Sequence, residues 1–202
     1  SGAGWREESY AATLEKVRAI GAALLARGMT ADTPILIMSG NGVDHALLAL
    51  AAQYIGVPTV PVAEQYSLIP AAHPRLVHAI EMVKPAMAYV VDEDVYSDAL
   101  ALDAMVGIEV VASRPKASSS KVTAFADLLK GSSADVDAAR ALVSPDSVAK
   151  ILMTSGSTSA PKGVLTTHAM MCVNQTQLRQ ALPMLSQHTP RVLDWLPWNH
   201  VF

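Results

Sequence analysis

The chain has 202 residues, of which 51% are hydrophobic and 16% charged, and its formal net charge is −3. This length and apolar content suit one domain, or two small lobes, with a sizeable core. The 15 lysines and arginines are scattered along the chain rather than clustered. The sequence therefore indicates neither a nucleic-acid surface nor a contact with an anionic membrane.

Cysteine content and hydropathy bear on the cellular compartment. A single cysteine, Cys172, excludes an internal disulfide and fits a reducing compartment. The N-terminus lacks the basic start and the apolar run of a signal peptide. The most apolar stretch, residues 46–55, is too short to span a membrane. We therefore expect a soluble, cytoplasmic protein with no membrane span.

The first half of the chain alternates helical patterns with short, continuous apolar runs. Helices are expected near residues 14–25, 43–55, 74–84 and 94–105, and strands at 34–38, 59–62, 87–91 and 108–111. Gly28, Gly56 and Pro85 are expected to end the first three helices. Residues 39–42, Ser-Gly-Asn-Gly, follow a strand but lack the G-x-G-x-x-G pattern of a dinucleotide site. Repeated strand–helix–strand units predict an α/β fold, with layers of parallel sheet and helices on both faces.

The pattern weakens in the next part of the chain and then returns. Two Ser-rich segments flank a short helix expected near residues 124–130, and a strand at 148–153 leads through a loop to a second strand at 164–167. Thr167 is expected to cap a helix over about 168–182, which Pro183 ends. These shifts divide the chain into a first α/β lobe at 1–112, a linker-rich connection at 113–144 and the start of a second lobe at 145–202.

The last residues are rich in large apolar groups. Residues 192–196 are expected to form a buried strand, with Trp195 in the core. Burial of Trp198 and Phe202 requires a further surface. We therefore expect the polypeptide to continue beyond Phe202. Cys172, on a predicted helix, is expected to pack rather than to react.

Residues 154–163, Thr-Ser-Gly-Ser-Thr-Ser-Ala-Pro-Lys-Gly, carry the clearest chemical signal. Hydroxyl groups and backbone amides can line an anion-binding concavity, and Lys162 adds a mobile cation suited to a phosphate. The segment fails the P-loop pattern, because Pro161 precedes Lys162, Gly163 follows it and a strand is expected next. The sequence therefore predicts a phosphate-binding loop between two strands, without a helix-dipole cradle. The alternative is a plain Ser/Gly-rich turn.

At these residues the sequence resembles the adenylate-forming superfamily, which includes acyl-CoA synthetases, aryl-CoA ligases, peptide-synthetase adenylation domains and luciferases. The signature loop of that superfamily reads roughly T-S-G-[ST]-T-G-x-P-K-G, and Ser159 departs from it where glycine is usual. The resemblance spans almost the whole chain and implies the first part of the large N-terminal domain of such an enzyme. Residues 150–154, 171–175 and 194–200 are most similar to feruloyl-CoA synthases.

The resemblance implies roles for individual residues. Those expected to bind the phosphates of ATP are Thr154, Ser155, Gly156, Ser157, Thr158, Lys162 and Gly163. Lys162 would also steady the departing pyrophosphate. His200 matches a histidine beside the acyl pocket, close to where the carboxylate meets the α-phosphate, and Trp198 and Asn199 would lie near that pocket. Lys162 and His200 are the candidate catalytic residues, and the spacing of His and Cys indicates no metal site.

The resemblance also implies a reaction. In an ATP-dependent acid–CoA ligase, a carboxylate attacks the α-phosphate to give an acyl-adenylate and pyrophosphate, and CoA then displaces AMP. The expected acid is ferulate or another hydroxycinnamate, with ATP, Mg²⁺ and coenzyme A. The Mg²⁺-holding Glu, the ribose-binding Asp and the late catalytic Lys of the superfamily have no match in this chain, so the 202 residues alone are expected to be inactive. The alternatives are an acyl-CoA synthetase for another acid, and a nucleotide-binding module without catalysis.

Overall fold

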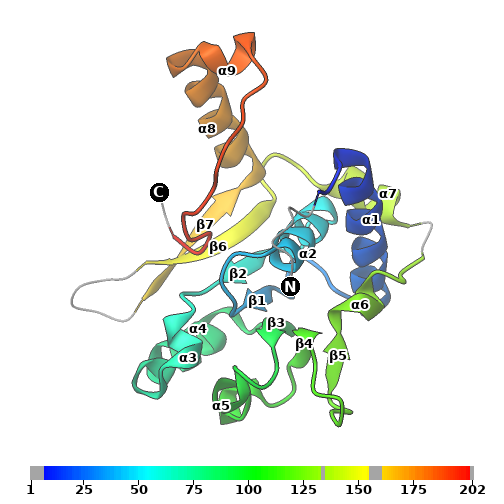
Figure 1. The fold of residues 1–202 in the computed structure, drawn as a ribbon, viewed down its shortest axis with the longest axis vertical. Coiled ribbons are helices and arrows are strands. Elements are labelled where there is room, and N and C mark those ends of the chain that lie inside the picture. Colours follow the sequence, from blue (N-terminus) through cyan, green and yellow to red (C-terminus); the bar gives the residue numbers. More distant parts are fainter. Residues whose placement is uncertain (1–6, 133–134, 155–160, 201–202) are drawn as a thin grey trace.

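The computed structural model describes residues 7–132, 135–154 and 161–200 of the chain. Its strands form one seven-stranded sheet in the order β5-β4-β3-β1-β2-β6-β7 (Figure 1). The strands are β1 (Ile35–Ile37), β2 (Thr59–Pro61), β3 (Met87–Asp92), β4 (Glu109–Arg114), β5 (Val122–Ala124), β6 (Val148–Thr154) and β7 (Lys162–Thr167). Neighbouring strands run parallel except for β6 and β7, which form an antiparallel hairpin. The expected α/β fold with a mostly parallel sheet is confirmed.

The helices predicted near residues 14–25, 43–55, 74–84 and 168–182 are confirmed as α1, α2, α4 and α8. The helices are α1 (Tyr10–Ala26), α2 (Val43–Tyr54), α3 (Gln65–Leu68), α4 (His73–Val83), α5 (Ser97–Leu100), α6 (Phe125–Leu128), α7 (Val136–Leu142), α8 (His168–Ala181) and α9 (Met184–Gln187), with 3₁₀ turns η1 (Pro70–Ala72) and η2 (Asp103–Met105). Gly28 and Gly56, just beyond α1 and α2, have φ angles of 72° and 77°. Glycine adopts this left-handed conformation without a Cβ penalty, which is why these helices end there.

One predicted helix is absent. The segment at 94–105 forms the short helix α5 and the turn η2, and Leu102 between them is extended, with ψ of 142°. Leu102 and the buried Met105 both pack against the core on that face of the sheet. Short helical segments owe their stability mainly to tertiary packing, and here packing favours the interruption.

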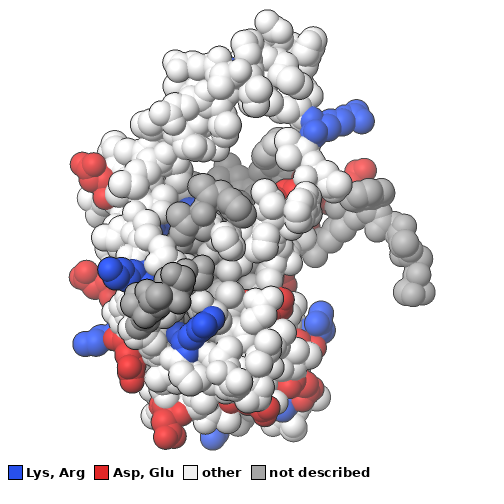
Figure 2. Space-filling view, turned by 90° about the vertical axis from the view of Figure 1, so that its left-hand side faces the viewer, with Lys and Arg blue, Asp and Glu red and all other residues white. Residues whose placement is uncertain are grey.

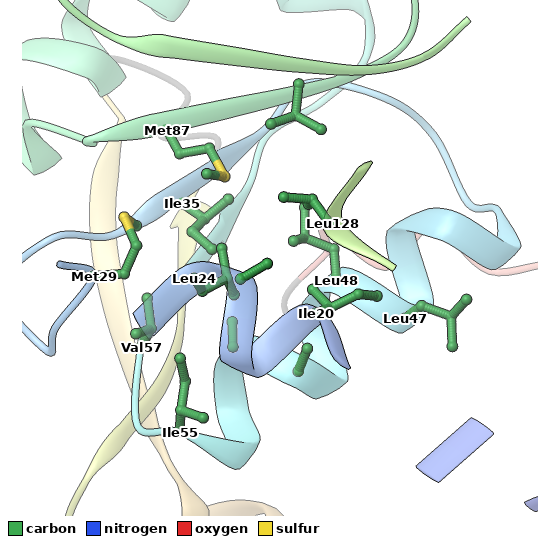
Figure 3. Packing of buried hydrophobic residues seen from close by; sticks show 14 of the residues in the cluster. Ile20, Leu24, Met29, Ile35, Leu47, Leu48, Ile55, Val57, Met87 and Leu128 are labelled. Carbon is green, nitrogen blue, oxygen red and sulfur yellow. The ribbon is translucent and has the colours of Figure 1, made fainter. Parts of the chain in front are cut away.

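Different helices cover the two faces of the parallel part of the sheet. Successive side chains of a strand point to opposite faces. Accordingly, Ile35 and Ile37 of β1 join a core cluster with α1, α2, α6 and α7, whereas Leu36 joins a second cluster with α3, α4 and α5. Figure 3 shows the first cluster, in which Leu24 of α1 and Leu48 of α2 lie beneath the strands. Both clusters consist of buried hydrophobic side chains, most of them aliphatic.

The β6–β7 hairpin extends away from this layered part (Figure 1). Its register with β2 is a single pair, Thr59 with Lys150, whereas β6 pairs with β7 from Val148 to Thr154. Thr167 caps α8 as predicted, and its hydroxyl accepts the N–H of Met170 at 3.3 Å. None of the side chains of α8 is buried.

Strands from every part of the chain share the sheet. β5, within residues 113–144, pairs with β4, and β6, within residues 145–202, pairs with β2. The division of the chain at 112 and 145 stays a prediction. In the part of the chain that the structure describes, no helix has both the length and the apolar content to cross a bilayer.

The prediction of a buried strand at residues 192–196 is wrong. The segment has no regular secondary structure, and Val192, Leu193 and Trp195 are 80%, 80% and 77% exposed. A strand needs a neighbour for its backbone hydrogen bonds, and β7 pairs with β6 alone among the described strands. Cys172 is also exposed, so the packing role expected for it is not seen in this chain.

Candidate functional site

The two ends of the predicted phosphate loop lie side by side on the hairpin. Thr154, the last residue of β6, pairs with Lys162, the first of β7. The Thr154 hydroxyl donates to the Lys162 carbonyl oxygen at 3.2 Å, and the Lys162 N–H approaches the same hydroxyl at 3.4 Å. The predicted strand after the loop is confirmed, because β7 begins at Lys162. The other residues predicted to bind phosphate, Ser155, Gly156, Ser157 and Thr158, lie outside the described residues.

Lys162 carries an exposed charge, whereas Gly163 has a role in packing. Lys162 is exposed, and the ion pairs formed among the described residues do not include it. Its ammonium group is therefore available to an anion. Gly163 has a packing role: a Cβ there would lie 3.0 Å from Ile151 Cγ2 and 3.4 Å from Met82 Sδ of α4. The missing side chain lets the hairpin approach α4 closely.

A contact that the sequence did not reveal supports the loop from α4. His78 Nε2 lies 2.9 Å from the carbonyl oxygen of Pro161, so the ring donates its Nε2 proton to that oxygen. Pro161 is buried. In the sequence, His78 lacks the spacing to other His or Cys that a metal site requires. Its partner lies 83 residues away, so no local pattern could have predicted the bond.

Trp198 and His200, two of the predicted acid-binding residues, line the same cavity. Its volume is about 510 Å³, and it lies between the β6–β7 hairpin and α8. The remaining wall consists of Lys150, Leu152, Thr166, Met170, Met171, Asn174, Gln175, Leu196 and Pro197. Asn199 is half-buried but does not line this cavity.

The loop ends lie on the same face of the hairpin as this cavity. Residues alternate between faces along a strand, so Lys150, Leu152 and Thr154 share one face of β6, and Lys162, opposite Thr154, shares it too. Lys150 and Leu152 line the cavity, whereas Ile151 packs on the other face with the second core cluster. Thr154 lies two residues beyond Leu152, about 7 Å along the strand. The predicted phosphate-binding and acid-binding residues therefore follow one another along one face.

Trp198 finds its packing surface within the chain. Its ring meets the ring of His45 on α2 edge-on, with centroids 5.0 Å apart and planes at 76°. Its Nε1 donates to the carboxylate of Asp194 at 2.6 Å. The expectation that Trp198 requires a further surface is thus corrected, because α2 half-buries it. Burial lowers the pKa of His45, so its imidazole is neutral at pH 7.

Trp198 also lines a second cavity. That cavity has a volume of about 270 Å³ and lies against α2 and β2. Lys150 and Trp198 line both cavities. A shift of Trp198 would therefore change the shape of both spaces at once.

Charged side chains are unevenly spread near the hairpin. Figure 2 shows charges of both signs over the lower part of this face, and an almost uncharged upper part, where α8 and α9 lie. Arg179 is the only Lys, Arg, Asp or Glu between residues 168 and 187. The wall that α8 gives to the larger cavity is thus apolar or neutral, and it suits an uncharged organic body rather than a second anion.

The described ends of the loop carry donors that fit phosphate. The Thr154 hydroxyl and the Lys162 ammonium are donors of the kind that bind phosphate oxygens. In the described ranges there is no group of three or more His, Cys, Asp or Glu side chains that could hold a metal ion.

Sequence comparisons bear on the family of the chain. The model of a family described as AMP-binding enzyme matches residues 2–202. Among curated proteins, the chain is 29% identical over 163 residues to the hybrid PKS-NRPS synthetase traA of Penicillium crustosum. That match covers 80% of this chain and 4% of the synthetase, so the chain spans a small part of this relative.

Solved structures share the fold at low sequence identity. MatB from Rhodopseudomonas palustris, without ligand and with ATP bound, has a TM-score of 0.64 at 22% identity over 88% of this chain and 33% of MatB. A luciferase-like enzyme from the mealworm Zophobas morio has a TM-score of 0.66 at 21% identity, over 81% and 37% of the two chains. The fatty acyl-adenylate ligase from L. pneumophila, in complex with acyl adenylate and pyrophosphate, has a TM-score of 0.64 at 17% identity, over 91% of this chain and 29% of the ligase. The chain thus spans about a third of each of these proteins.

Proposed function

Because the chain belongs to the AMP-binding enzyme family, we propose that the complete protein uses ATP to activate a carboxylic acid as an acyl-adenylate and then transfers the acyl group to coenzyme A. One observation carries this proposal. Thr154 and Lys162, at the ends of the loop, lie on the same hairpin face as the cavity lined by Trp198 and His200. Phosphate and acid could therefore meet along one surface.

The chemistry asks this surface to bring two anions together. A carboxylate oxygen bonds to the α-phosphorus, and the bond from that phosphorus to the pyrophosphate oxygen breaks. Lys162 would offset the charge that builds up on the departing pyrophosphate. The Thr154 hydroxyl, which donates to the Lys162 carbonyl oxygen in this structure, would turn from that oxygen to donate to a phosphate oxygen. His200, at the cavity wall, would orient the carboxylate by a hydrogen bond from its ring, while Trp198 would hold the acid in place.

We propose ferulate or another hydroxycinnamate as the acid. Trp198 offers a flat aromatic wall to a planar ring, and Met170 and Met171 offer soft apolar surface. Asn174 and Gln175 could hydrogen-bond a phenolic hydroxyl. A cavity of about 510 Å³ also lies within the range of roughly 300–1,000 Å³ that is usual for small-molecule sites. The similarity of residues 194–200 to feruloyl-CoA synthases supports the same choice.

The test is the substitution Lys162→Ala in the complete polypeptide, assayed by acid-dependent ATP–pyrophosphate exchange. We expect kcat to fall about 100-fold, as when one preorganised donor to a transition-state anion is removed. The matched control is Lys130→Ala, because Lys130 is an exposed lysine that pairs with Asp127 on α6. We expect that control to stay within about twofold of the parent. Exchange by Lys162→Ala as fast as the parent at every ATP concentration would end the proposal.

The identity of the acid has its own test. Thioester formation by the complete polypeptide should show the highest kcat/KM with hydroxycinnamates in a panel that also contains benzoic and fatty acids. A fatty or benzoic acid that outperforms them would overturn the choice of acid and leave the adenylation proposal standing. The 202 residues alone should form no CoA thioester.

We also propose that the protein is cytoplasmic, because the lone thiol of Cys172 would stay reduced there.

A further inference from the structure

Asn41, in the loop between β1 and α2, holds the backbone on both sides of Pro197. Its Nδ2 donates to the carbonyl oxygen of Leu196 at 2.7 Å, and its Oδ1 accepts the N–H of Trp198 at 3.0 Å. The partners are 155 and 157 residues away in the sequence. One planar amide that both donates and accepts in this way fixes the position and the direction of the bound peptide, much as a neighbouring strand would.

The segment that Asn41 binds has little else to hold it. Residues 192–198 form no helix or strand. Other hydrogen bonds of this segment are local: the carboxylate of Asp194 accepts the Leu196 N–H at 3.2 Å and the Trp198 Nε1–H at 2.6 Å, and the Pro197 carbonyl oxygen accepts the His200 N–H. Among the described residues, the hydrogen bonds that join residues 192–198 to distant parts of the chain are the two from Asn41.

Asn41 itself sits in a loop that is fixed from three directions. The Ser39 hydroxyl accepts the N–H of Val91 on β3 at 2.5 Å. The carbonyl oxygen of Gly40 lies 3.1 Å from Nδ1 of the buried His45 on α2. On its third side the loop meets Glu64, whose Oε2 would lie 3.1 Å from a Cβ at position 40. The amide of Asn41 is therefore preorganised and does not have to be ordered when it binds the segment.

We propose that Asn41 is a positioning residue for the acid-binding cavity, and that it sets the placement of Trp198 and His200 through the backbone at Leu196 and Trp198. His200 follows closely, because its N–H donates to the Pro197 carbonyl oxygen at 3.2 Å and closes a turn on the held peptide. Displacement of this turn would change the positions of the Trp198 and His200 side chains relative to the hairpin face. The inference rests on the proposed function, since it assigns Asn41 a part in placing the acid.

The first measurement is structural and needs no activity. In the complete polypeptide, Asn41→Ala should raise the hydrogen–deuterium exchange rate of the Trp198 amide about tenfold or more, because its acceptor is lost. The matched control is Gly42→Ser in the same loop. Gly42 is extended, with φ of −176°, a Cβ there meets nothing within 4 Å, and serine is a favoured N-cap for α2. Exchange of the Trp198 amide in this control should match the parent.

The second measurement is kinetic. Loss of both hydrogen bonds should lower kcat/KM for the acid about 30-fold, while KM for ATP stays within about twofold of the parent. Asn41→Asp keeps an acceptor for the Trp198 N–H but places a second acceptor against the Leu196 carbonyl oxygen. Because two acceptors repel, its kcat/KM should be no higher than that of Asn41→Ala. A role in folding alone would affect both substrates alike.

Each result decides the proposal. Unchanged exchange of the Trp198 amide in Asn41→Ala would overturn it, and so would faster exchange with kcat/KM for the acid unaltered. Absence of acid-dependent pyrophosphate exchange in the parent protein would instead contradict the proposed function. In that event the exchange of the Trp198 amide would still show whether Asn41 holds the segment.

Discussion

The layered sheet and the arm that follows it are built in different ways. In the layers, β1–β5 lie between helices, and side chains such as Ile35, Leu48 and Leu76 are 0% exposed. In the arm, made of β6, β7, α8 and the segment to residue 200, α8 has no buried side chain, and Val192 and Trp195 are largely exposed (Figure 1). Burial orders the first region, whereas hydrogen bonds to distant residues order much of the second.

This difference matches where the chemistry is proposed. Lys162, Trp198 and His200 all belong to the arm, and the contacts that fix their surroundings, from His78 and Asn41, come from the layers. Binding residues commonly lie on segments of low intrinsic stability that a rigid scaffold positions. The layers of this protein would therefore act as the scaffold of the proposed site, and the side chains of His78 and Asn41 would help to position it.

The largest expected effect contrasts a buried leucine in the layers with a partly exposed leucine in the arm. Leu48→Ala empties a fully buried position in the first core cluster and should lower the free energy of unfolding by about 3 kcal/mol. Leu178→Ala, on α8, removes a side chain that is 40% exposed and should cost less than about 0.5 kcal/mol. Urea denaturation of the complete polypeptide measures both. Equal losses would mean that α8 is as well packed as the layers.

The second effect tests whether the segment at 113–144, predicted to be a linker-rich connection, packs against the layers. Gly131 lies in a segment expected to be a linker, yet a Cβ there would lie 2.1 Å from the Ala19 carbonyl oxygen and 2.8 Å from the Ala23 nitrogen of α1. Backbone atoms cannot rotate away, so Gly131→Ala should destabilise the protein by about 2 kcal/mol. Gly42→Ala, where a Cβ meets open space, is the control for thermal unfolding. A Gly131→Ala protein as stable as that control would show that α1 does not pack there.

The third effect compares two helix caps of the same kind. The Ser9 hydroxyl accepts the Ala12 N–H at 3.1 Å at the start of α1, and Thr167 caps α8 in the same way. Alanine at either position should cost about 1 kcal/mol. We expect Ser9→Ala to lower the global unfolding midpoint, and Thr167→Ala to speed amide exchange only within α8. A global loss from Thr167→Ala as large as that from Ser9→Ala would contradict the separation of the two regions.

The smallest effect concerns pH at the junction of the two regions. Burial holds the pKa of His45 below its usual 6.5, so the unfolded state binds this proton more readily. The contribution of His45 to stability is complete above pH 6.5 and declines as the pH falls below that value toward the folded pKa. His45→Gln, which keeps a donor for the Gly40 carbonyl oxygen, should flatten the decline.

Two comparisons isolate this effect. Desolvation also lowers the pKa of His168, so the His45 share is the difference between the parent and His45→Gln in unfolding midpoints from pH 7.5 to 5. His188→Gln, in the exposed part of the arm, serves as the matched control. Identical pH dependence in the parent and His45→Gln would show that His45 titrates alike in the folded and unfolded states.

Local features of the sequence determined much of the fold. Continuous apolar runs located β1 to β4 and β6, because buried parallel strands need apolar side chains on both faces. Glycines at 28 and 56 located two helix ends, and Thr167 the start of α8, because left-handed turns and N-caps depend on one residue each. The loop at 154–163 marked the candidate site for a similar reason: its hydroxyl groups and its lysine are contiguous in the chain.

Only the tertiary structure decided how the arm is held. The apolar run at 192–196 predicted a strand, but none of the described strands pairs with it. The bonds from His78 to Pro161 and from Asn41 to Leu196 and Trp198 join residues between 83 and 157 positions apart. Sequence periodicity reports which face of an element is buried, whereas the pairing of two distant polar groups depends on how the whole chain folds.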